Sequence, residues 1–239
     1  MFTRTESLKE FVRYYPVVTT IVLIHIALYL LTSLPIFPSM LLFEKLVGVN
    51  LYVVQGEIWR LITPIFMHSG FTHMLFNSFS LVLFGPALER IVGKRRFILL
   101  YVLTGLLANV ATLILMPLTY THVGSSGAIY GLFGFYAAMI FFKQQILSKE
   151  NSQVILTITA IGVIMTFFQP NINITAHLFG LLAGFLFGAF MYGNRENFRR
   201  RSAHRTSSYK RSFSFSKPTF PQVVLIILIS LAIIGFLFK

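Results

Sequence analysis

The stretch GSSGAIYG, residues 124–131, decides how the rest of the chain is interpreted, because it places two serines between two apolar runs. The second apolar run continues directly from it, so Ser125 or Ser126 stands where a membrane helix begins. A helix N-terminus carries backbone N–H groups without intrahelical partners and the positive end of the helix dipole, which together stabilise developing negative charge. The flanking Gly124 and Gly127 allow unusual backbone angles and close approach of another helix. The stretch therefore predicts a hydroxyl group beside a site that can hold an oxyanion.

The composition indicates that this stretch lies in a membrane protein. Of the 239 residues, 56% are hydrophobic and only 11% are charged, and the mean hydropathy is +0.76, too apolar for an ordinary soluble domain. The chain has no cysteine, and all seven of its acidic residues are glutamates. Cysteine nucleophiles, thiolate metal sites and a Ser-His-Asp triad are therefore excluded. Any serine hydrolase chemistry in this chain has to rely on serine and histidine.

The apolar runs predict an all-α, polytopic membrane helix bundle in a bilayer about 30 Å thick. The fourth run, 126–142, is short for a crossing helix, so we expect its serine end to start below the outer surface in a solvated cavity. A cytoplasmic N-terminal segment, 1–16, precedes a core of six helices within 17–192. A basic loop at 193–217 follows, and a seventh helix is expected at 222–238. The six core spans are expected at about residues 17–34, 71–88, 97–116, 126–142, 152–168 and 174–192.

Residues 35–70, between the first two spans, are too broken to cross the membrane and too apolar to lie wholly in water. We expect a partly embedded lateral element there. Within it, Trp59 is interpreted as an interface anchor. The adjacent Arg60 has a guanidinium group that can bond carbonyls or lipid phosphate.

The distribution of charge predicts the orientation. Lysines and arginines number 20 and give a net charge of +13, and 17 of them fall in the N-terminal segment, in the turns after the second and fourth spans, and in the basic loop. By the positive-inside rule these segments are cytoplasmic, and after seven crossings the C-terminus is external. We interpret the basic loop as a contact with anionic lipid rather than with nucleic acid. The composition favours a bacterial plasma membrane.

Polar side chains occur near the external ends of three spans that all run inward. His73 and Asn77 lie on one face of the second span, Ser126 begins the fourth, and His177 lies near the start of the sixth. Topology alone brings these residues to one depth near the external face. In nucleophilic acyl transfer, an imidazole takes the proton of a hydroxyl and later gives it to the leaving amine. Ser126 and His177 can fill these roles, with His73, Asn77 and the Ser126 N–H as donors to the oxyanion.

Small and aromatic residues predict how the fourth and sixth spans meet. Because no aspartate is present to orient the imidazole of His177, we expect Tyr130 to stack on it. Small residues form a ridge on each helix that permits close packing. The ridges consist of Gly127, Gly131 and Gly134 on the fourth span and of Gly180, Gly184 and Gly188 on the sixth.

These residues together resemble the rhomboid family of intramembrane serine proteases. The resemblance implies a core of six helices plus one, with Ser126 rather than Ser125 as nucleophile, His177 as base, and His73 and Asn77 at the oxyanion site. It also implies that the substrates are single-pass membrane segments with small, helix-destabilising residues near the cut, which enter sideways near the fifth span. The matching elements are Trp59-Arg60, His68 ahead of His73-x-x-x-Asn77, Glu89-x-x-x-Gly93, Gly124-Ser125-Ser126-Gly127 with Tyr130, and Ala176-His177-x-x-Gly180-x-x-x-Gly184.

Other functions fit these residues less well. A catalytically silent rhomboid-like protein would bind membrane helices without cutting them, but both Ser126 and His177 are present. A transporter or channel would need an inverted repeat or several charged intramembrane residues, and the sequence has neither. We expect no metal or other cofactor, because no His-Glu-x-x-His motif occurs and the spacing of His73, His122 and His177 does not call for zinc. His25, away from any motif, is interpreted as a packed or interfacial histidine rather than a ligand, and the sequence does not predict the oligomeric state.

Overall fold

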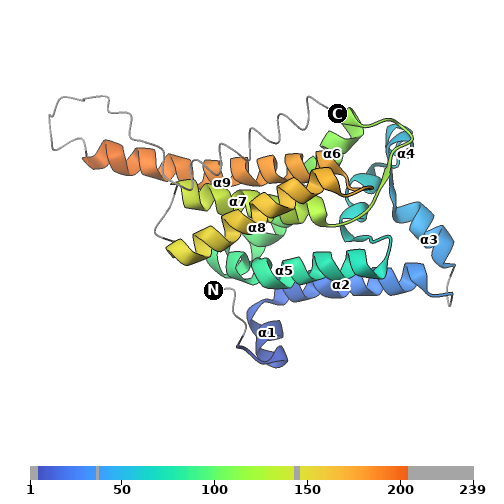
Figure 1. The fold of residues 1–239 in the computed structure, drawn as a ribbon, viewed down its shortest axis with the longest axis horizontal. Coiled ribbons are helices and arrows are strands. Elements are labelled where there is room, and N and C mark those ends of the chain that lie inside the picture. Colours follow the sequence, from blue (N-terminus) through green and yellow to red (C-terminus); the bar gives the residue numbers. More distant parts are fainter. Residues whose placement is uncertain (1–4, 36–37, 143–145, 204–239) are drawn as a thin grey trace. The chain divides into compact units, whose positions relative to one another are not determined.

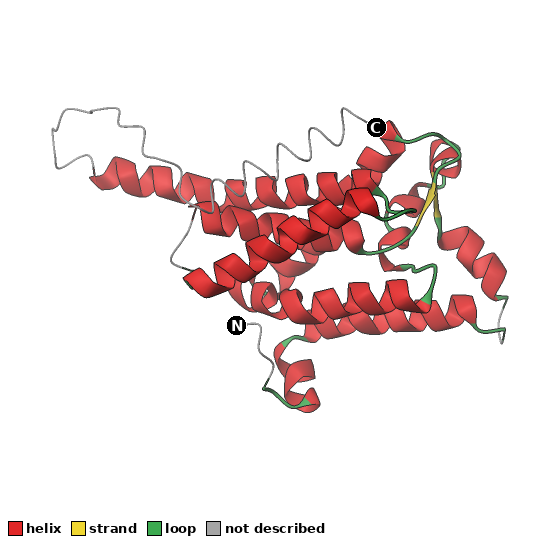
Figure 2. Cartoon of the chain, viewed as in Figure 1, coloured by secondary structure: helices red, strands yellow, loops and turns green. Residues whose placement is uncertain are grey.

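The computed structural model describes residues 5–35, 38–142 and 146–203, with only the backbone described from 193 onward. The described part is helical apart from one short pair of strands (Figure 2). A mainly helical fold is thus confirmed, and the six-plus-one arrangement stays a prediction. The expected seventh span, 222–238, lies outside the described residues, as does the basic loop beyond residue 203.

The elements follow the order that the apolar runs predict. Within the described residues, five helical stretches are long and apolar enough to cross a membrane: α2, α5, α6, α8 and the Ile174–Tyr192 part of α9. The apolar helix α7 is shorter, at 17 residues. The bounds are α1 Leu8–Tyr14, α2 Pro16–Ser33, α3 Ser39–Leu46, β1 Gly48–Val49, α4 Asn50–Val54, η1 Ile58–Leu61, η2 Thr63–Phe66, α5 Phe71–Val92, α6 Lys94–Leu115, β2 Thr121–His122, α7 Ser126–Phe142, α8 Lys149–Phe168 and α9 Ile174–Ala203.

Two helices end later than the apolar runs suggested. α5 continues through a buried Glu89 to Val92 and stops at Gly93, whose φ of +83° favours glycine. α9 continues to Ala203, eleven residues past the expected end of the span. The added residues contain no proline and include four arginines, which favour helix, so the helix does not end where the hydrophobic residues end.

The described chain divides into two compact units. The first comprises the residues up to Leu132 together with Asn173–Ala183, and the second comprises Phe133–Ile172 and the chain from Gly184 onward. All the residues that the sequence proposes for catalysis fall in the first unit.

In the first unit, α2 lies along α5, which in turn packs against α6 (Figure 1). The contact is close at Gly85 of α5, where a Cβ atom would lie 2.8 Å from Cγ2 of Val18. Glu89 fixes the start of α2, because its two carboxylate oxygens accept hydrogen bonds from the backbone N–H groups of Val17 (3.1 Å) and Val18 (2.9 Å). A buried charge is thus satisfied by helix-end donors that would otherwise lack partners.

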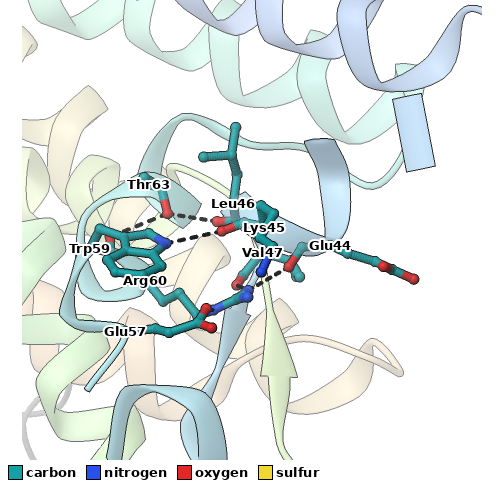
Figure 3. A network of polar contacts seen from close by, with 8 residues as sticks. All are labelled: Glu44, Lys45, Leu46, Val47, Glu57, Trp59, Arg60 and Thr63. Atoms are coloured by element: carbon teal, nitrogen blue, oxygen red, sulfur yellow. Dashed lines mark hydrogen bonds and ion pairs between the residues drawn. The ribbon is translucent and has the colours of Figure 1, made fainter. Parts of the chain in front are cut away.

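The segment between α2 and α5 is held by a network of polar contacts to its own backbone (Figure 3). The indole N–H of Trp59 donates to the carbonyl of Lys45 (3.1 Å). Arg60 is 2% exposed, and its guanidinium donates to the carbonyls of Glu44 and Val47 and to the carboxylate of Glu57 (2.6 Å). Of the two partners expected for Arg60, the structure therefore selects carbonyls rather than lipid phosphate.

The same segment is tied to the rest of the first unit. β1 pairs antiparallel with β2, with Gly48 opposite His122. The side-chain amide of Asn50 donates to the carbonyl of Pro117 (3.0 Å), and that of Asn109 on α6 donates to the carbonyl of Leu61 (2.9 Å). These bonds fix the segment that leads into α5.

The second unit is packed through aromatic side chains and one glycine. Gly188 on α9 lies so close to α7 that a Cβ atom would lie 2.5 Å from the Cβ of Ala138. Phe135 contacts both Phe187 and Tyr192, with ring centroids 6.2 and 5.7 Å apart. Helix α8 begins after Ser148, whose hydroxyl accepts from the N–H of Asn151.

Candidate active site

Helix α7 begins at Ser126, as the sequence predicts. The preceding Gly124 has a φ of +120°, and its N–H donates to the carbonyl of Pro64 (2.9 Å). The two serines that follow this turn differ in their exposure to solvent. The side chain of Ser125 is fully buried, whereas Ser126 is only partly buried and keeps some accessible surface.

Helices α7 and α9 touch through their backbones next to Ser126 and His177. A Cβ atom on Gly180 would overlap the carbonyl oxygen of Gly127. On the other side, a Cβ atom on Gly127 would lie 3.4 Å from the carbonyl oxygen of Ala176 and 2.8 Å from the Cβ of Ala108 on α6. Gly127 follows Ser126, and Ala176 precedes His177, so the crossing brings these two residues onto facing helices.

One part of the expected glycine ridge faces a different helix. Gly131 lies against the side chain of Thr104 on α6, where a Cβ atom would overlap its hydroxyl oxygen, rather than against α9. Gly184 is buried in α9. The contact of Gly127 with Gly180 is therefore the part of the ridge that the structure supports in the first unit.

The expected stacking of Tyr130 on His177 is confirmed. The two rings are nearly parallel, with an interplanar angle of 17° and centroids 4.1 Å apart. Both side chains are buried, at 8% and 7% exposure. Tyr130 lies one helical turn after Ser126, so the stack fixes the imidazole against the helix that carries the serine.

The first turn of α9 is fixed by Asn173, a residue that sequence reasoning missed. Its side-chain oxygen accepts from the N–H of Ala176 (2.9 Å), which is the geometry of a helix N-cap. Its amide nitrogen donates to the hydroxyl of Thr112 on α6 (3.0 Å). His177, four residues along, donates its own N–H to the Asn173 carbonyl (3.2 Å). An Asn directly before a helical run was the available signal.

His73 and Asn77 converge on Gly124 from the first turns of α5. A Cβ atom on Gly124 would lie 2.7 Å from both Cε1 and Nε2 of His73 and 3.8 Å from Nδ2 of Asn77. The Asn77 amide also donates to the carbonyl of His73 (3.1 Å), which fixes its orientation. Two side-chain donors thus pack against the turn that leads into Ser126, and the His73 ring lies so close to Gly124 that a Cβ atom there would force a shift.

Three imidazoles, those of the buried His25 and His68 and of the partly buried His73, lie in a row that the sequence did not predict. The ring centroids of His25 and His68 lie 4.7 Å apart and those of His68 and His73 lie 5.1 Å apart, both pairs edge-on. His25 on α2 is fully buried and bonds to the hydroxyls of Ser78 and Tyr101, both at 3.2 Å. The interpretation of His25 as packed holds, but it is not remote from the motifs.

The loop histidines are held in their neutral form by burial. Burial, followed by the neighbouring His25 and His73, lowers the pKa of His68 to about 2. Burial lowers the pKa of His122 to about 4. His122 lies on β2 with its ring under Gly48, where a Cβ atom would lie 2.6 Å from it. Within residues 5–35, 38–142 and 146–203, no three side chains gather as ligands for a metal ion.

Comparison with known proteins agrees with these observations. Residues 55–194 match the model of the Rhomboid domain. The chain is 51% identical over 186 residues to the Bacillus subtilis protein named "Putative rhomboid protease YdcA", over 78% of this chain and 94% of that protein. It is 34% identical over 140 residues to Rhomboid protease GluP of the same species, over 59% of this chain and 27% of that protein. RHOMBOID-like protein 1 of Arabidopsis thaliana is 32% identical over 154 residues, 63% of this chain and 39% of that protein.

Proposed function

Because the chain belongs to the rhomboid family of intramembrane serine proteases, we propose that it cleaves transmembrane segments of other proteins with a dyad of Ser126 and His177. The observation that carries the proposal is the backbone contact between Gly127 and Gly180, next to a histidine ring stacked on Tyr130. It supports an arrangement in which the hydroxyl and the imidazole belong to one site.

In the proposed mechanism, the Ser126 hydroxyl attacks the carbonyl carbon of the scissile peptide bond while His177 accepts its proton. The histidine then gives this proton to the leaving amine, and an acyl-enzyme ester remains on Ser126. Water next attacks the ester as His177 accepts a proton from it, and the same proton returns to the serine oxygen when the acid product leaves. The stack on Tyr130 and the cap at Asn173 supply the orientation that an aspartate supplies in a triad.

The oxyanion of each tetrahedral intermediate would be stabilised by three donors. These are the backbone N–H of Ser126 at the start of α7, Nε2 of His73 and Nδ2 of Asn77. The packing of His73 and Asn77 against Gly124 supports this assignment, because it puts both side-chain donors beside the turn that leads into Ser126. One such donor is typically worth about 100-fold to 1,000-fold in kcat.

We infer the substrates and the location from the family and the charge distribution. The substrates are single-pass membrane segments with small, helix-destabilising residues near the cut, which enter sideways near α8. The N-terminus is cytoplasmic, and the active site lies near the external face of a bacterial plasma membrane. A polypeptide must leave its helical form to reach the serine, since a helical peptide bond keeps its hydrogen bonds and is shielded.

The alternative is a catalytically silent protein that binds membrane helices. The presence of both members of the dyad favours the protease. The test is labelling of the purified protein by a fluorophosphonate probe, which reacts with an activated serine. Wild type and Ser125→Ala should label, whereas Ser126→Ala and His177→Ala should not. If Ser126→Ala still labels and Ser125→Ala does not, the nucleophile is Ser125 and not Ser126. If the wild type neither labels nor cleaves a transmembrane reporter, the silent protein is favoured.

A further inference from the structure

We propose that Ser69 is a positioning residue that sets the tautomer of His73. In the proposed arrangement its hydroxyl is the donor to Nδ1, so that the single ring proton of the neutral imidazole sits on Nε2, the atom that faces the oxyanion. The inference rests on the proposed function, because that function gives His73 the role of donor.

The two edges of the His73 ring face different groups. Nδ1 lies 3.3 Å from Oγ of Ser69, four residues earlier and just ahead of the first turn of α5. The opposite edge, Cε1 and Nε2, faces Gly124, where a Cβ atom would lie 2.7 Å from both atoms. One edge is thus held by a hydroxyl, and the other points at the turn that leads into Ser126.

The position of the proton decides whether His73 helps or hinders catalysis. A neutral imidazole has one N–H donor and one acceptor nitrogen, and the hydrogen bond at one nitrogen determines the role of the other. An oxyanion can only accept hydrogen bonds. With the proton on Nδ1, the lone pair of Nε2 would point at the oxyanion and repel it, so only the Nε2–H tautomer stabilises the intermediate.

Apart from Ser69, no polar group among the described residues makes a hydrogen bond to the ring of His73. His68 packs against His73 edge-on, at an interplanar angle of 80°, but neither of its ring nitrogens has a hydrogen-bond partner within the part of the chain that the structure describes. The Asn77 amide donates to the backbone carbonyl of His73 and not to its ring. The Ser69 hydroxyl, 3.3 Å from Nδ1, is therefore the polar contact to the ring, and the inference assigns it the role of donor.

The test compares Ser69→Ala, which removes the hydroxyl, with Ser69→Thr, which keeps it. Ser69 is exposed, so neither variant should alter the thermal unfolding temperature. In Ser69→Ala, we expect the maximal rate of modification by a fluorophosphonate to fall about threefold to tenfold, the range that one neutral hydrogen bond supplies. The half-saturating probe concentration should stay unchanged, and Ser69→Thr should restore the rate.

Two further measurements distinguish positioning from a general structural effect. In protein labelled with ¹⁵N-histidine, with the His73 signals assigned from their loss in His73→Gln, wild type and Ser69→Thr should show Nε2 protonated. Ser69→Ala should show a mixture of tautomers. In the His73→Ala background, adding Ser69→Ala should cause no further loss of rate, because the bond acts only through this ring.

The failure of this inference can be told apart from the failure of the proposed function. If Ser126→Ala still labels, the dyad is wrong, whatever Ser69 does. If Ser126→Ala is unreactive while Ser69→Ala keeps both the wild-type rate and the wild-type histidine spectrum, the inference about Ser69 alone is overturned. A fall in rate that persists in the His73→Ala background would overturn it as well.

Discussion

The contact between α7 and α9 can be tested by adding one methyl group. In Gly180→Ala, the new Cβ atom would overlap the carbonyl oxygen of Gly127. A backbone carbonyl cannot rotate away, so the two helices have to separate by roughly 1 Å to restore van der Waals contact. Overpacking of this kind costs about 1–3 kcal/mol, and the better helix propensity of alanine returns up to about 1 kcal/mol of it.

The larger expected effect is on activity. A displacement of about 1 Å between reacting groups can lower a rate about 100-fold, because Ser126 and His177 lie on the two helices that move. The assay is the rate of fluorophosphonate labelling, together with thermal unfolding in detergent. We expect a strong loss of labelling and only a moderate fall in unfolding temperature.

A matched control comes from Gly105 on α6. In Gly105→Ala, the new Cβ atom would lie 2.8 Å from Cδ1 of Ile65, the end of a flexible side chain, and 3.2 Å from the Cβ of Ala128. A small side-chain rotation relieves most of this contact, so labelling should stay within about threefold of the wild type, the equivalent of roughly 0.7 kcal/mol. Equal behaviour of Gly180→Ala and Gly105→Ala would refute the argument that a close backbone crossing sets the geometry of the dyad.

Three other perturbations have expected outcomes. Glu89→Gln keeps the shape of the side chain but leaves the N–H group of Val17 or Val18 facing an amide N–H, so the free energy of unfolding should fall by about 2 kcal/mol. The control is Glu150→Gln, on the exposed first turn of α8, which should shift the unfolding temperature little. Burial lowers the folded-state pKa of His68 to about 2, so the unfolded state binds more protons than the folded state below about pH 6.5. As the pH falls below that value, the free energy of unfolding should decrease by up to about 1.4 kcal/mol per pH unit. A His68→Gln variant that loses stability as steeply as the wild type on acidification would contradict this. Tyr130→Ala removes the stack on His177 and should lower the labelling rate about tenfold, because an aromatic pair contributes about 0.5–1.5 kcal/mol. Tyr130→Phe keeps the ring, so its labelling rate should stay near that of the wild type. Equal loss in both variants would assign the effect to the hydroxyl.

The helices and the candidate site were predictable because their signals are local in sequence. Long apolar runs predict membrane spans, and a serine between glycines at the start of such a run indicates a helix N-terminus. Alternation of spans then brings residues from every second helix to the same end, which is why Ser126, His73 and His177 were expected to meet. The stack of Tyr130 on His177 followed from their positions one turn inside facing helices.

Contacts that depend on how helices rotate about their axes were not predictable. Gly131 has the same spacing of small residues as Gly127, yet it faces α6. An α-helix has 3.6 residues per turn, so small residues placed every fourth position on α7 turn gradually around the helix and face more than one neighbouring helix. The partner of Glu89 is the start of α2, about 70 residues away, and no periodicity reports it. His25 has no motif residue near it in the sequence, because its neighbours in the structure come from α5, α6 and the loop that contains His68.

The low-dielectric surroundings explain why a dyad without aspartate suits this chain. An unpaired carboxylate buried beside His177 would have to be compensated at high cost. The two buried charges described here, Glu89 and Arg60, each contact several backbone groups that need a partner. The proposed site instead orients its histidine with neutral contacts, a ring stack and a helix cap, so no net charge has to be buried before the serine attacks. In the proposed mechanism, charge would then appear only in the tetrahedral intermediate, which the N-terminus of α7 and the donors beside Gly124 would stabilise.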